Sequence, residues 1–134
     1  MTEKPANLFA TIPAELPEEL FETLLRGRDF RLERIVSRGH ATPEGQWYDQ
    51  DEHEWVLLVS GAAALEIEGR EELRVLAPGD HVLLPARCRH RVAWTAAEEE
   101  TVWVALFYSP LQVEGAGADY GKQQRGGGRS VDSP

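Results

Sequence analysis

From Phe30 onward, apolar and polar residues alternate in short runs, which is the period of β-strands. The runs are separated by turns rich in glycine and proline and by clusters of acidic residues. The expected strands are Phe30–Ser37, Gln46–Val59, Ala63–Glu68, Leu73–Leu76, His81–Leu84, His90–Trp94 and Thr101–Tyr108. Because no helical run interrupts these strands, a parallel α/β sheet is disfavoured. The pattern predicts an all-β fold, an antiparallel sandwich or barrel.

The chain before Phe30 follows a different pattern. Residues 1–12 are expected to form an extended arm. Over residues 14–26 apolar positions recur at the helical period, and Gly27 suits a C-terminal cap. One apolar stripe contains Leu16, Leu20, Phe21 and Leu24. This predicts an N-terminal helix that packs on the outside of the barrel.

The composition changes again after Gln112. The last 22 residues, 113–134, are rich in glycine and poor in apolar side chains. Such a segment buries too little surface to offset its ordering entropy, so it is expected to be disordered. The predicted organisation is an arm and helix over residues 1–29, a barrel over residues 30–112 and a Gly-rich tail over residues 113–134.

Charge and composition restrict the class of partner. The chain has 134 residues, a net charge of −9 and one cysteine. An acidic surface repels phosphate backbones, so nucleic acid is not an expected partner. One cysteine permits no internal disulfide, which favours a reducing compartment. No run approaches the roughly 20 apolar residues of a membrane span, so a cytoplasmic protein without membrane contact is expected.

One segment carries a recognisable motif. A Pro-Gly-Asp turn at residues 78–80 leads into an apolar run that ends at Pro85, and His90 opens the next run. Gly79, Pro85 and His90 fall on the second signature of the cupin superfamily, which this segment resembles. Arg87 stands where that signature has its second glycine, and Trp94 stands where it has asparagine.

The first cupin signature is present upstream in altered form. Glu54 and Gly61 have the spacing of its glutamate and glycine, whereas the positions of its two histidines hold Tyr48 and Gln50, or Trp47 and Asp49 for the longer gap. The chain is similar to small single-domain bacterial cupins of unassigned activity. The resemblance implies a double-stranded β-helix, or jelly-roll barrel, and a divalent metal bound inside it.

Strand alternation places Tyr48, Gln50 and Glu54 on one face, and His90 and Trp94 on one face of a later strand. In a cupin these faces line one cavity. The expected metal ligands are therefore Gln50, Glu54 and His90, a mixed N/O set that suits Fe(II), Mn(II), Ni(II) or Zn(II). Tyr48 and Trp94 are expected to contact a ligand. The alternative is a metal-free polar pocket in which Glu54 and His90 pair.

Three further features suggest chemistry or assembly. His40 lies in a loop that could reach the cavity as a general base, so His40 and Tyr48 are the catalytic candidates. Arg87, Arg89 and Arg91 flank His90, and Arg87 is expected to hold an anionic ligand unless Glu98–Glu100 neutralise these arginines. Outward-facing Trp47 and Trp55, together with a strand apolar on both faces, Thr101–Tyr108, suggest a homodimer.

The sequence leaves open whether the protein is an enzyme. The leading interpretation is a cupin that binds a small organic molecule and uses a divalent metal. By resemblance, its reaction would be oxygen-dependent oxidation or isomerisation of a small organic acid. The alternative is a non-enzymatic, metal-free ligand-binding or sensor module.

Overall fold

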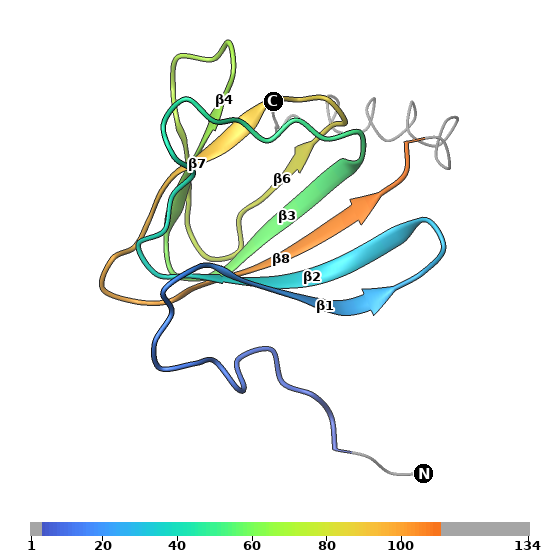
Figure 1. Cartoon of the computed structure of the whole chain (residues 1–134), viewed down its shortest axis with the longest axis vertical. Coiled ribbons are helices and arrows are strands. Elements are labelled where there is room, and N and C mark those ends of the chain that lie inside the picture. The colour runs from blue at the N-terminus through green and yellow to red at the C-terminus, as the bar shows by residue number, and fades with distance from the viewer. Residues whose placement is uncertain (1–3, 111–134) are drawn as a thin grey trace.

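The computed structural model describes residues 4–110 and shows an all-β protein (Figure 1). Its five-stranded antiparallel sheet has the order β1-β2-β8-β3-β6, and a three-stranded sheet has the order β5-β4-β7. The strands are β1 (Leu20–Arg26), β2 (Phe30–Ser37), β3 (His53–Ser60), β4 (Ala63–Ile67), β5 (Arg74–Leu76), β6 (His81–Leu84), β7 (His90–Thr95) and β8 (Thr101–Tyr108). The predicted tail at residues 113–134 lies outside the described residues.

The alternating pattern located the barrel strands well. The bounds of β2, β6 and β8 match the prediction at both ends, and those of β4, β5 and β7 differ by one residue. Strand β3 is the exception, because it begins at His53, not at Gln46. Residues 49–52 read Asp-Gln-Asp-Glu, and acidic and amide residues disfavour a strand, so only the isolated bridge between Tyr48 and His90 remains upstream.

The predicted N-terminal helix is wrong. Within the described residues there is no α-helix, and Leu20–Arg26 forms β1, which pairs with β2 along the edge of the larger sheet. A short isolated helix is marginal in water, whereas pairing with β2 gives the backbone a hydrogen-bonding partner. Gly27, expected as a helix cap, donates its backbone N–H to the Phe30 carbonyl at 2.9 Å and closes the β1–β2 hairpin.

The N-terminal arm lies along the outer side of β1 and β2 (Figure 1). Arg34 of β2 holds it there, since its Nη1 donates to the carbonyl oxygens of Leu8 and Ala10 at 2.8 Å each. Glu22 pairs with the same guanidinium, and Arg34 is 4% exposed. A buried arginine with these partners fixes the arm without a helix.

The hydrophobic core lies between the inner faces of the two sheets. The larger sheet contributes Ile35, Val56, Leu58, Leu84, Trp103, Ala105 and Phe107, and the smaller sheet contributes Ala63, Leu65, Ile67 and Leu76. Antiparallel pairing aligns these side chains in rows, as in Ile35 opposite Trp103 and Val56 opposite Ala105. The rows leave a cavity between the sheets that is lined by apolar side chains and a few polar ones.

The outer face of β3, β6 and β8 carries apolar side chains around Trp55. Trp55 lies between Leu83 and Leu106 in the paired rows, and its ring contacts that of His81 at 5.3 Å between centroids. Trp55 therefore faces away from the core, as alternation indicates. That a second copy of the chain binds this face and forms a homodimer stays a prediction, which light scattering would test. None of the described residues forms a helix suited to crossing a membrane.

Candidate functional site

A cavity of about 70 Å³ opens between the two sheets. Since one water needs roughly 10–15 Å³ by this measure, the cavity has room for a ligand of about five non-hydrogen atoms or slightly more. Its polar lining consists of Glu19, Tyr48, Gln50, Glu54 and His90. Its apolar lining consists of Phe21, Ile35, Val56, Leu65, Leu84, Val92, Trp103 and Phe107. The mixture of apolar walls and a few polar groups is typical of small-molecule sites.

Backbone hydrogen bonds place Tyr48 and Gln50 at this cavity. Tyr48 and His90 exchange N–H···O bonds of 2.7 and 3.1 Å, and the Arg87 N–H donates to the Gln50 carbonyl at 2.7 Å. The segment from 48 to 50 therefore lies across the turn that precedes β7. The predicted grouping of Tyr48, Gln50, Glu54 and His90 at one cavity agrees with the structure, although no continuous strand produces it.

Glu54 and His90 face each other inside the barrel. Glu54 lies on β3 and is 8% exposed, and His90 opens β7 and is 4% exposed. His90 Nε2 lies 3.5 Å from Glu54 Oε1, and Gln50 Nε2 donates to the same oxygen at 3.0 Å. One carboxylate oxygen is therefore the centre of the three-residue cluster that the sequence predicted.

The other nitrogen of His90 fixes the orientation of the ring. Nδ1 lies 2.9 Å from the Cys88 carbonyl oxygen, which can only accept, so Nδ1 carries a proton and donates it. In the neutral imidazole the Nε2 lone pair then points at the Glu54 carboxylate. Burial of the ring opposes its charge, but the hydrogen bond to Glu54, the Glu54 charge and the Cys88 carbonyl outweigh it and raise the pKa of His90.

Tyr48 lies against His90. The two rings are stacked, with centroids 5.5 Å apart and an interplanar angle of 26°. Burial, together with the negative charges of Glu19 and Glu54, raises the pKa of the Tyr48 hydroxyl, against a smaller opposite effect of its hydrogen bond with Thr42. The phenol therefore stays protonated at neutral pH and can donate a hydrogen bond.

Glu19 is a cavity residue that the sequence interpretation missed. It immediately precedes β1, and its neighbour at i+2, Phe21, also lines the cavity. The helical interpretation placed Glu19 in the first turn of a surface helix. The period-two relation between Glu19 and Phe21 was the available signal, because residues two apart share one face of a strand.

Two predicted site residues lie elsewhere. Trp94 is 39% exposed and is not part of the cavity lining, because the register between β4 and β7 shifts by one residue between Val92 and Trp94. This bulge reverses the alternation that placed Trp94 with His90. His40 is also outside the cavity: its Nδ1 accepts from the Arg38 backbone N–H at 2.9 Å, and its carbonyl accepts from the Thr95 hydroxyl.

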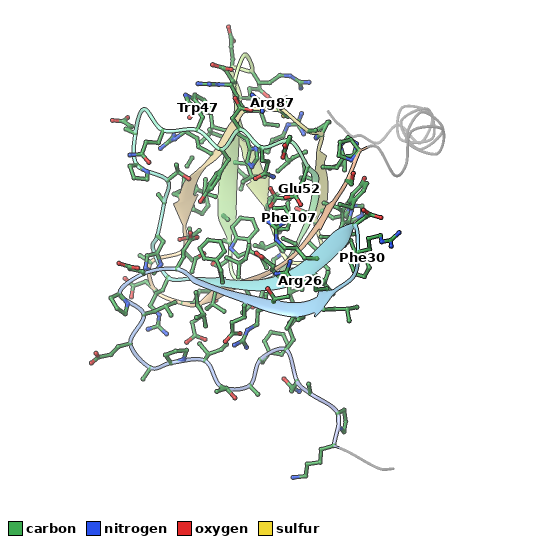
Figure 2. The ribbon with its side chains drawn as sticks, turned by 45° about the vertical axis from the view of Figure 1, so that its right-hand side comes forward. Arg26, Phe30, Trp47, Glu52, Arg87 and Phe107 are labelled. Atoms are coloured by element: carbon green, nitrogen blue, oxygen red, sulfur yellow. The ribbon has the colours of Figure 1, made fainter. Side chains whose placement is uncertain are left out.

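The arginines near His90 do not enter the cavity. The Arg87 side chain is 66% exposed, and its Nε lies 3.1 Å from Asp49. Arg89 pairs with Glu68 at 2.9 Å, and Arg91 pairs with Glu66 at 2.7 Å. In Figure 2, Arg87 is labelled near the top of the molecule, above Phe107. The arrangement therefore gives no support to an anion held in the cavity by Arg87.

Arg87 has a backbone conformation that explains the family's glycine at its position. Its φ is +67°, a left-handed conformation that costs a non-glycine residue about 1–2 kcal/mol. We expect Arg87→Gly to be more stable than Arg87→Ala by about 1 kcal/mol in chemical denaturation, because both variants lose the Asp49 contact and only glycine relieves the backbone. Equal stability of the two variants would contradict this explanation.

Glu54 and His90 fit a divalent cation. His90 Nε2 and Glu54 Oε1 both direct lone pairs into the space between them. Their separation of 3.5 Å is shorter than two metal–ligand bonds of about 2.1 Å each, so one ion could contact both atoms. The Cys88 carbonyl supplies the outer hydrogen bond that metal-binding histidines commonly make. Gln50 fits less directly, since its amide nitrogen faces Glu54 and its oxygen would bind an ion only after the amide turns over.

The chain is similar to proteins of known fold. A family model described as a cupin domain matches residues 35–107. A Ralstonia eutropha protein, provisionally called a mannose-6-phosphate isomerase, is 48% identical with a TM-score of 0.77, over 80% of this chain and 99% of that one.

Two more distant structures share the fold alone. A cupin superfamily protein from Desulfitobacterium hafniense is 16% identical with a TM-score of 0.65, over 81% of this chain and 93% of that one. A Streptococcus pyogenes protein of unknown function is 20% identical with a TM-score of 0.63, over 82% of this chain and 90% of that one. No protein of curated function matches the chain. The family model and the 48% identical relative show that the chain belongs to the cupin family.

Proposed function

We propose that the protein binds a small organic molecule in the cavity between its sheets, next to a divalent cation held by Gln50, Glu54 and His90. The observation that carries the proposal is the pair of lone-pair-bearing atoms, His90 Nε2 and Glu54 Oε1, 3.5 Å apart in a buried place. When the imidazole is neutral these atoms repel each other. A cation between them, either a metal ion or a proton, removes that repulsion.

The reaction classes that the cupin resemblance implies are isomerisation and oxygen-dependent oxidation. The 48% identical relative, itself provisionally called an isomerase, supports isomerisation. A bound divalent ion would act as a Lewis acid that polarises an oxygen of the ligand. The residues of the chain orient the ligand: Tyr48 donates a hydrogen bond from its protonated hydroxyl, and the apolar walls exclude water.

A metal-free ligand-binding module is the second candidate, and one observation favours it. Gln50 donates to Glu54, and a protonated His90 would complete a cluster that needs no metal. Residues 4–110 also contain no group of three or more His, Cys, Asp or Glu side chains that could hold an ion. In this interpretation the cavity recognises a ligand without transforming it.

A melting experiment separates the two candidates. Fe(II), Mn(II), Ni(II) or Zn(II) added to chelator-treated protein should raise the melting temperature, because a ligand of the native state stabilises it by mass action. His90→Ala should abolish the shift, since it removes the cluster's imidazole. His81→Ala is the matched control, because His81 is exposed and contacts Trp55. No shift with any of the four ions would leave the metal-free module as the better description.

A further inference from the structure

Glu19 is half-buried and is held at the cavity by a chain of two hydrogen bonds. Ser37 Oγ donates to Glu19 Oε2 at 2.6 Å, and Trp103 Nε1 donates to Ser37 Oγ at 3.2 Å. Ser37 is 0% exposed and Trp103 is 3% exposed. These bonds fix one carboxylate oxygen of Glu19. Among residues 4–110, no hydrogen bond is made to the other oxygen, Oε1.

Among the described residues, Glu19 is the carboxylate of the cavity lining that faces no basic side chain, whereas Glu54 faces His90. The ionisable lining residues of the cavity are Glu19, Tyr48, Glu54 and His90, and no lysine or arginine is part of the lining. Glu19 forms no salt bridge within residues 4–110. The electrostatic potential near it therefore favours a cation and disfavours an anion.

The walls around Glu19 suit the apolar part of such a ligand. Phe21, Tyr48 and Trp103 all line the cavity, and aromatic faces attract cations as well as apolar groups. Phe107 already has a cation over its ring, Arg31 at 4.1 Å, and Glu33 and Glu52 neutralise that arginine. A phosphate or carboxylate group would find no cationic side chain in this lining.

We propose that Glu19 is the residue that selects the ligand, by accepting a hydrogen bond from a protonated amino group of a small organic cation. The proposal rests on the cavity being the binding site. It adds the charge class of the ligand, which is opposite to the acid that Arg87 suggested in the sequence. Ser37 and Trp103 act as positioning residues, because they hold the carboxylate and do not themselves carry charge.

The test uses chelator-treated protein, in which no divalent ion adds positive charge to the cavity, and three probes of nearly equal size: isobutylammonium, isobutanol and isobutyrate. We expect isobutylammonium to bind about tenfold more tightly than isobutanol by calorimetric titration, and isobutyrate to bind more weakly than either. In Glu19→Gln, isobutylammonium and isobutanol should bind with about equal affinity. Glu18→Gln is the matched control, since it removes the same charge from an exposed residue outside the cavity and should leave the preference unchanged.

Ser37→Ala provides a second test that keeps the charge. It should reduce the preference for isobutylammonium by a factor smaller than that of Glu19→Gln, because the carboxylate remains but loses its anchor. Equal binding of the three probes, tightest binding of isobutyrate, no binding of isobutylammonium, or an unchanged preference in Glu19→Gln would each overturn the proposal. Metal content at Glu54 and His90 is measured separately, so a failure of the metal site is distinguishable from a failure at Glu19.

Discussion

Gly61→Ala is expected to destabilise the fold by about 3 kcal/mol, the sum of a left-handed backbone penalty and overpacking. Gly61 has a φ of +92°, which favours glycine. A Cβ atom there would lie 2.6 Å from the Cα of Thr101 and 2.8 Å from the carbonyl oxygen of Glu100. These are backbone atoms at the start of β8, so the strand itself would have to shift.

Gly69→Ala is the control for Gly61→Ala. Gly69 has a similar φ of +88°, but a Cβ there would meet no atom within 4 Å. Gly69→Ala should therefore lower the free energy of unfolding only by the left-handed backbone penalty, about 1–2 kcal/mol. Chemical denaturation of both variants measures the difference. Equal losses would show that close packing against β8 is not the reason for glycine at position 61.

Glu54→Gln is expected to remove a pH-dependent part of the stability of the metal-free protein. The pKa of His90 is raised in the folded state, so this group binds its proton more tightly when folded. Its contribution is fully present below its unfolded pKa of about 6.5 and is lost as the pH rises through the raised folded pKa. Glu54→Gln removes the Glu54 charge and hydrogen bond, the two largest causes that raise the pKa of His90.

The measurement is the free energy of unfolding of chelator-treated wild-type protein and of Glu54→Gln at about pH 5.5 and about pH 9, on either side of the ordinary histidine pKa. The wild type should exceed the variant by more at the lower pH. Other titrating groups affect both proteins alike and cancel in the difference. A wild-type advantage that is constant or grows with pH would contradict the role given to Glu54.

The sequence predicted the fold correctly from a few motif residues at turns and strand ends. Gly61, Gly79, Pro85 and His90 carried the cupin resemblance, and the family match and the strands around them agree with it. Short apolar or alternating runs bounded by turn residues located β2, β6 and β8. These signals are local, so they can be recognised without knowing the fold.

The features that were missed depend on contacts between distant segments. β1 has apolar residues compatible with either period, and pairing with β2 decided for a strand. Trp94 points away from the cavity because of a bulge where β7 pairs with β4. The sequence of β7 alone does not indicate this bulge. Glu19 lies at the cavity because it precedes β1 and is held by Ser37. Tyr48 and Gln50 lie there because their backbones bond to His90 and Arg87.

The most direct test of the shared cation site is the metal content of protein purified without chelator, measured by mass spectrometry. The account expects about one divalent ion per chain in the wild type. It expects a large loss of that ion in both variants, because Glu54→Gln removes the carboxylate charge and His90→Ala removes the imidazole nitrogen that faces it. Glu19→Gln should keep the ion. Wild-type protein without stoichiometric metal, or equal metal in wild type and Glu54→Gln, would contradict the account.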